Sequence, residues 1–77
     1  MSQIEKVEIN TESIQLDQFL KWAGVLESGG QVKPMLEEEL ILVNGKIETA
    51  KRRRLFDGDQ VAIKDLGIWQ VVVKKEA

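Results

Sequence analysis

The spacing of the apolar residues changes near residue 40 of this 77-residue chain. Before that point they recur at helical intervals, which predicts two short helices, over 16–23 and about 31–39. Beyond it they alternate with polar residues, which predicts short strands. The predicted strands cover 41–43, 46–49, 61–63 and 69–73, with a further short strand near 7–9. We therefore expect an α+β fold, in which a two-helix hairpin packs on a small, mainly antiparallel sheet of three to five short strands.

Turn residues separate these predicted elements. Gly24 stands where the C-terminus of a helix favours a residue that can adopt a positive φ. Ser28-Gly29-Gly30 offers a turn and N-capping groups before the second helix. Pro34 is compatible with that helix if the helix begins near Gly30, because the missing N–H then falls close to the first turn. Asn44-Gly45 is the strongest short signal for a type I′ hairpin turn.

The composition excludes several kinds of chemistry. The chain has no cysteine and no histidine, which removes disulfides, thiolate nucleophiles, cysteine-ligated metals and the commonest general base. No nucleophile–base pair or pair of carboxylates has support in the sequence, so we expect no enzyme activity, no cofactor and no metal. No apolar run approaches the roughly 20 residues that span a bilayer, and the N-terminus lacks a signal peptide. We expect one cytoplasmic, monomeric domain over 1–77 that binds no membrane and no small-molecule substrate.

Charge is unevenly distributed along the chain. Residues 1–40 hold eight acidic and three basic residues, a net charge of −5, whereas residues 41–77 hold eight basic and five acidic residues, a net charge of +3. Half of those eight bases are adjacent: Lys51, Arg52, Arg53 and Arg54, hereafter the basic segment. Screening confines each charge to about 8–10 Å, so a local cationic cluster can bind a polyanion although the whole chain is acidic.

The motifs and their spacing resemble a known family, the RNA-binding domain named after protein S four of the small ribosomal subunit, also called the αL RNA-binding motif. The residues that carry the resemblance are Leu16-Asp17-x-x-Leu20, Gly24, Ser28, Leu36, Val43-Asn44-Gly45, Gly58-Asp59, Val61 and Ile63. They cover about residues 14–64 without a gap, and a C-terminal strand over 69–73 follows. The chain looks most like the small stand-alone bacterial members, which are RNA-binding or ribosome-associated.

Three positions depart from the pattern of that family. Many members carry basic residues where this chain has Gln15 and Gly29, and a glycine where it has Glu39. Two cations expected to face RNA are therefore missing from the helical side. That loss places more of the expected binding on the basic segment.

The resemblance and the charge pattern together imply a non-catalytic module that grips the phosphate backbone of structured RNA, with ribosomal RNA as the target that the family implies. The expected contacts are Lys33, Gln31, Lys21, Lys46, Lys51, Arg52, Arg53 and Arg54. Arginine suits phosphate because its planar fork can donate two hydrogen bonds. Lys33 lies in the first turn of the second helix, where it adds to the partial positive charge of the helix terminus. For Lys33 and Lys46, an ordinary solvated lysine is an equally good interpretation.

Other conspicuous residues have structural interpretations. Asp17 fits a helix cap better than a catalytic acid, and Asp57 and Asp59 fit a turn around Gly58 better than a metal site. Trp22 is expected at the rim of the core rather than stacked on a base. We expect three aromatic side chains in the core: Phe19, Phe56 and Trp69. The acidic run over 37–39 is expected to be a solvated face.

Two other functions remain open from the sequence. Asn44-Gly45-Lys46 and Asp57-Gly58-Asp59 superficially resemble strands of small ubiquitin-like sulfur carriers, but those carriers need a free Gly-Gly carboxyl end and this chain ends Glu76-Ala77. A protein-interaction adaptor that uses the acidic residues 37–39 is the other alternative.

Overall fold

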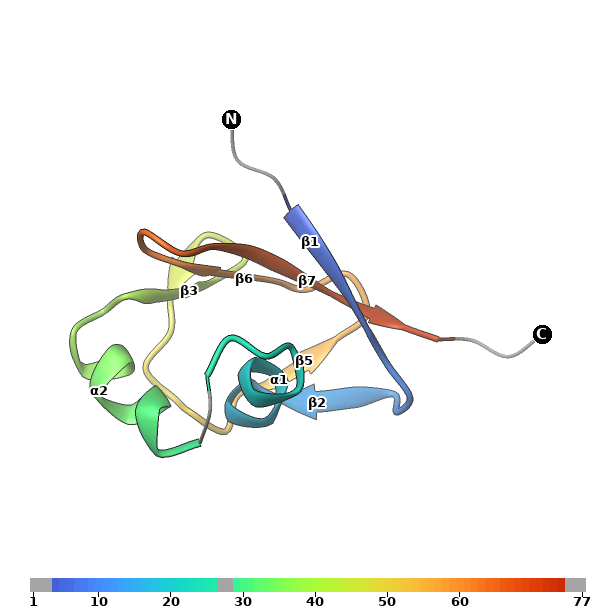
Figure 1. Cartoon of the computed structure of the whole chain (residues 1–77), viewed down its shortest axis with the longest axis horizontal. Coiled ribbons are helices and arrows are strands. Elements are labelled where there is room, and N and C mark those ends of the chain that lie inside the picture. Colours follow the sequence, from blue (N-terminus) through green and yellow to red (C-terminus); the bar gives the residue numbers. More distant parts are fainter. Residues whose placement is uncertain (1–3, 27–28, 75–77) are drawn as a thin grey trace.

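The computed structural model of this protein describes residues 4–26 and 29–74, in which short helical elements lie on one side of a sheet (Figure 1). The elements, in chain order, are β1 (Ile4–Ile9), β2 (Ser13–Gln15), α1 (Leu16–Trp22), the 3₁₀ turn η1 (Gly29–Gln31), α2 (Val32–Glu37), β3 (Ile41–Val43), β4 (Lys46–Ile47), β5 (Arg54–Phe56), β6 (Gln60–Ile63) and β7 (Gly67–Val73). The α+β class is confirmed. Both helices are shorter than predicted, and Ser28 lies outside the described residues.

Five strands form one sheet in the order β1-β7-β6-β3-β4. Strands β3, β4, β6 and β7 pair antiparallel, as predicted, but β1 runs parallel to β7 over its whole length. The sheet is therefore mixed. The parallel pair brings the first and last strands of the described chain side by side. The alternating pattern near 7–9 predicts a strand there, but it does not predict which strand pairs with it.

Strands β2 and β5 form a separate antiparallel pair, hereafter the β2–β5 ribbon, which the sequence did not predict. Each strand has three residues, too few for an alternating pattern to stand out from its surroundings. The pairing also joins segments about 40 residues apart, with Ile14 opposite Leu55. Helix α1 begins at the residue that follows β2, so the ribbon fixes where α1 starts.

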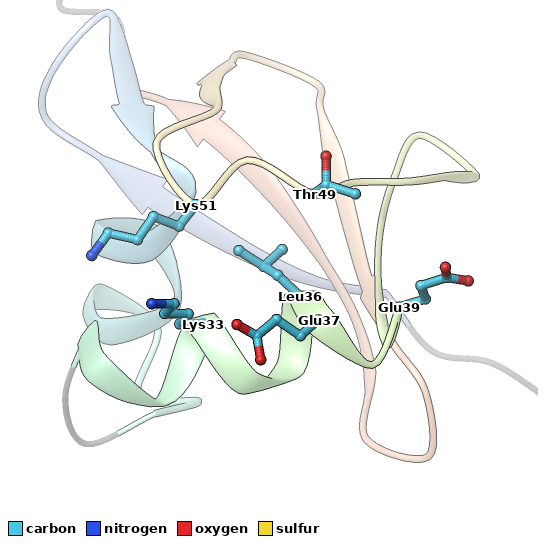
Figure 2. Close-up of a pocket in the computed structure, with 6 residues that line it drawn as sticks. All are labelled: Lys33, Leu36, Glu37, Glu39, Thr49 and Lys51. Atoms are coloured by element: carbon cyan, nitrogen blue, oxygen red, sulfur yellow. The ribbon is translucent and has the colours of Figure 1, made fainter.

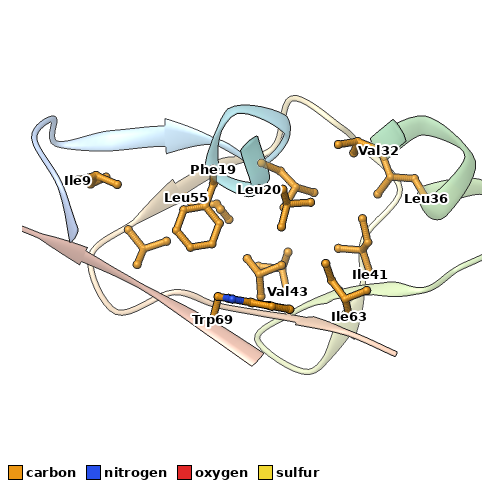
Figure 3. Packing of buried hydrophobic residues seen from close by; sticks show 13 residues of the cluster. Ile9, Phe19, Leu20, Val32, Leu36, Ile41, Val43, Leu55, Ile63 and Trp69 are labelled. Atoms are coloured by element: carbon orange, nitrogen blue, oxygen red, sulfur yellow. The ribbon is translucent and has the colours of Figure 1, made fainter. Parts of the chain in front are cut away.

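One apolar core fills the space between the helices and the sheet (Figure 3). Helix α1 contributes Leu16, Phe19 and Leu20, which are fully buried, and α2 contributes Val32 and Leu36. Trp69 is buried, as predicted, opposite Val61 in the β6–β7 pair. The core is completed by Ile9, Ile41, Val43, Leu55, Val61, Ile63 and Val71.

Backbone conformation at the turns agrees with the predicted signals. Asn44 and Gly45 both have positive φ, 53° and 84°, as a type I′ turn requires, and Gly24 has φ 77° after α1. Glu39 also has a positive φ, 58°, and directly follows Glu38, the C-cap residue of α2. Its N–H donates to the carbonyl of Leu36, and the next N–H, of Leu40, donates to that of Met35, which closes the helix. A side chain with a Cβ is strained in this conformation.

Replacing Glu39 with glycine is therefore expected to stabilise the fold by about 0.5–1 kcal/mol, because glycine adopts positive φ without that strain. Glu38→Gly is the matched control: Glu38 has φ −88°, so glycine relieves nothing there and only adds entropy to the unfolded chain. Urea denaturation of the two variants measures the difference. A Glu39→Gly variant no more stable than Glu38→Gly would contradict this account of the helix end.

Candidate nucleic-acid interface

The basic segment is held against the start of α1 by its own backbone. The carbonyl of Arg53 accepts a hydrogen bond from the N–H of Leu16 (2.8 Å), and the carbonyl of Lys51 accepts one from the N–H of Asp17 (3.0 Å). Helix α1 has no side-chain N-cap bond, so these two carbonyls satisfy N–H groups that the helix leaves unpaired. The backbone of the basic segment is thus fixed, while all four of its side chains are exposed.

Strand β5 orients the end of the basic segment. Side chains alternate along a strand, so burial of Leu55 turns Arg54 and Phe56 outward. Arg54 lies opposite Gln15 in the β2–β5 ribbon, and its Nη1 donates a 2.8 Å hydrogen bond to Oγ of Ser13. Leu55, which is fully buried, anchors the end of the basic segment in the core. The prediction that Phe56 belongs to the core is wrong: its side chain is 54% exposed because it lies on the opposite face of β5 from Leu55.

Within residues 4–26 and 29–74, Arg53 is the one member of the basic segment that forms an ion pair with a carboxylate of the chain itself. Its Nη1 lies 2.9 Å from Oε1 of Glu48. The second oxygen of Glu48 accepts from the N–H groups of Thr49 and Ala50, both at 3.0 Å. Glu48 therefore holds two things in place: the backbone at residues 49 and 50, which leads into the basic segment, and the side chain of Arg53. The Glu48 side chain is only 13% exposed, but that of Arg53 is 47% exposed, so the guanidinium can still be reached by a phosphate.

Lys33 of α2 and Lys51 of the basic segment line the same pocket, although 18 positions separate them in the sequence (Figure 2). The pocket has a volume of about 530 Å³ and is also lined by Leu36, Glu37, Glu39 and Thr49. Both ammonium groups lie on one side of it in Figure 2. The sequence predicts both lysines as contacts but does not predict that they line one pocket. That arrangement depends on the path of residues 43–54 relative to α2.

The remaining predicted contacts are Gln31, Lys21 and Lys46, and none of them lines this pocket. Gln31 ends η1, two positions before Lys33, and is exposed. Lys21 is in the last turn of α1, one helical turn after Asp17 and hence on the same helix face. Lys46 lies in β4, at the edge of the five-stranded sheet and beside the hairpin turn, and it does not line the pocket. The structure thus brings Lys51 of the basic segment to the pocket that Lys33 lines, and Lys46 does not line it.

Three acidic residues interpreted as structural have structural contacts. Asp17 lies in the first turn of α1 and accepts a hydrogen bond from the N–H of Gln18, but α1 has no side-chain N-cap bond, so the prediction that Asp17 caps the helix is wrong. Asp57 accepts from the N–H of Val73, and Asp59 accepts from the N–H of Phe56 and from the side-chain amide of Asn44. Among residues 4–26 and 29–74, no three acidic side chains come together in a way that could hold a metal ion.

Trp22 is exposed rather than set at the rim of the core. Its side chain is 58% exposed, and its indole N–H donates a 2.8 Å hydrogen bond to the carbonyl of Glu8 in β1. It lines a second pocket together with Gln18, which is on the same face of α1. The face of Gln18 and Trp22 is not the one that Asp17 and Lys21 share. Ser13, whose Oγ accepts the hydrogen bond of Arg54, also lines this second pocket.

No helix in the described parts of the chain is long and apolar enough to cross a membrane.

Comparison with known proteins gives two matches. The model of a family described as "S4 domain" matches residues 7–72, which include every described element except part of β1 and the end of β7. A protein of Bacillus subtilis (strain 168) named "Probable ribosome maturation protein RlbA" is 46% identical over 66 residues, a match that covers 86% of this chain and 93% of that protein.

Proposed function

This chain belongs to the S4 domain family, and on that basis we propose that it is a non-catalytic RNA-binding protein that grips the phosphate backbone of structured RNA. Membership confirms the resemblance drawn from residues 14–64. The name of the Bacillus relative supports ribosomal RNA, in a free or a ribosome-bound form, as the target. The proposal assigns the role to a single monomeric domain in which α1 and α2 form a hairpin. The contact between α1 and η1, the turn that leads into α2, supports the hairpin.

The observation that carries the proposal is the fixed backbone of the basic segment beneath exposed side chains. Two main-chain hydrogen bonds to α1 and the pairing of Arg54 in the β2–β5 ribbon hold the backbone. The entropy lost on binding phosphate is then mainly that of the side chains, because the backbone is already ordered. Lys33 adds a further cation from α2. Such an array contacts phosphates whatever the base sequence, so the RNA is recognised mainly by shape.

The expected result for a salt titration follows from the number of contacts. With about four to six phosphates contacted, the logarithm of the association constant should fall with the logarithm of salt concentration at a slope of about −3 to −5. Fluorescence anisotropy with a labelled ribosomal RNA hairpin, from 50 to 300 mM KCl, measures it, with a single-stranded RNA of equal length for comparison. A slope shallower than about −1, or no binding at low salt, would refute phosphate gripping.

A further inference from the structure

We propose that the pocket between α2 and residues 49–51 receives one unpaired guanine nucleotide of the bound RNA, and that the Glu37 carboxylate reads its base. The inference rests on the proposed function and adds a point of sequence recognition to it. Lys33 and Lys51 hold the phosphate, the exposed edge of Leu36 contacts the base, and Glu37 accepts hydrogen bonds from the Watson–Crick edge of the guanine.

The pocket has the size and composition of a site for a small organic group. Its volume of about 530 Å³ lies within the range of about 300–1,000 Å³ that is typical of ligand sites. Leu36, otherwise buried with 6% exposure, forms an apolar part of the wall. An apolar wall suits the face of a base, whereas phosphate and ribose gain nothing from it.

The cationic side of the pocket is available for a phosphate. Lys33 and Lys51 are both exposed, and neither forms an ion pair within 4.0 Å with any residue in the described ranges. Their ammonium groups lie on the same side of the pocket in Figure 2, although one comes from α2 and the other from the basic segment. Because both lysines line one pocket, a single phosphate bound there can attract both ammonium groups.

The pocket also contains carboxylates, which repel a phosphate. A carboxylate can instead accept hydrogen bonds from a base. Glu37 and Glu39 both line the pocket. In Figure 2 the carboxylate of Glu37 points toward the lysine side and that of Glu39 points away. Glu37 is therefore the carboxylate positioned to meet a nucleotide whose phosphate lies on the two lysines.

Guanine is the base that a carboxylate selects. Its Watson–Crick edge presents two adjacent donors, the ring N1–H and the exocyclic amino group, and the two oxygens of a carboxylate accept both. Adenine and cytosine present one amino donor beside a ring acceptor, and uracil presents one donor between two carbonyls, so each of them sets an acceptor against the negative charge. This edge is free only in loops, bulges and strand ends, so the nucleotide must be unpaired.

The test uses the full chain and four hairpin RNAs that differ only in one bulged nucleotide, G, A, C or U. The wild-type protein should bind the G bulge about tenfold or more tightly than the other three, as expected for one bidentate base contact. Glu37→Gln should reduce that preference to about twofold or less, because an amide offers one acceptor and one donor. Glu38→Gln is the matched control, since Glu38 is exposed, carries the same charge and does not line the pocket.

Each possible outcome decides the question. Both variants remove one negative charge and should bind all four RNAs slightly more tightly, so only the change in preference reports on the pocket. Loss of the preference in Glu37→Gln but not in Glu38→Gln supports the guanine site. Equal wild-type binding to all four RNAs, or a preference that survives in Glu37→Gln, overturns the guanine site and leaves phosphate gripping intact. Failure to bind any of the four overturns both proposals.

Discussion

Replacing Arg52 and Arg54 together with glutamate is expected to weaken binding to structured RNA about 100-fold or more at 100 mM salt. Each change removes a charge-assisted hydrogen bond to phosphate and adds a charge that repels it. The ion pair between Arg53 and Glu48 stays in place, so the path of the chain into the basic segment is kept. The slope of the salt dependence should also become less negative by about 1.5–2, because two phosphate contacts are lost.

The matched control is the pair Lys64→Glu and Lys74→Glu, which changes the net charge of the chain equally. Both lysines are exposed and lie outside the site, one in the turn after β6 and the other after the end of β7. If binding depended on net charge alone, the two double variants would lose affinity equally. Equal losses would therefore contradict the assignment of binding to the basic segment, and anisotropy titrations of both variants with one hairpin RNA make the comparison. Thermal unfolding of each variant checks that its fold is kept.

Local signals allowed the sequence to predict much of this fold. The apolar stripe of α1, the Asn44-Gly45 turn and the alternating residues of β6 are each encoded within a few consecutive positions. Their physical origin is also local, because helical spacing, turn conformation and strand alternation depend on near neighbours. Pairings between distant segments were harder to predict. The parallel contact of β1 with β7 and the β2–β5 ribbon join segments that no short pattern relates.

The candidate site shows the same division between local and distant information. The four adjacent cations are evident from the sequence. Only the structure shows that backbone carbonyls of the basic segment accept hydrogen bonds from the first N–H groups of α1. The sequence predicts a buried Phe56 because phenylalanine is usually buried, but the short strand β5 has one inward position and Leu55 occupies it. Glu37 is exposed, as the sequence predicts for a solvated face, but only the fold shows that it lines the same pocket as Lys51.

Leu55→Ala is expected to destabilise the protein by about 2–5 kcal/mol, because Leu55 is fully buried and the truncation leaves a cavity. That is a large part of the total, since a chain of this length is stable by only about 4–12 kcal/mol. Phe56→Ala, at the next position, should cost less than about 1 kcal/mol, because half of that side chain is already in water. Urea denaturation followed by circular dichroism gives both values, and equal losses would show that the inward and outward assignments in β5 are wrong.

Leu55→Ala should also loosen the basic segment while leaving every one of its charges in place. Leu55 follows Arg54 and packs β5 into the core, so its loss weakens the hold on the carbonyls of Lys51 and Arg53. The N–H groups of Leu16 and Asp17 donate to those carbonyls, and they should exchange with deuterium faster in Leu55→Ala than in Phe56→Ala. RNA affinity, measured where both variants are folded, should fall in Leu55→Ala beyond any fall in Phe56→Ala, because the arginines must then be ordered on binding. If exchange at Leu16 and Asp17 increases and affinity is unchanged, the cations act as a flexible tail, and the fixed backbone is not what makes this surface bind RNA.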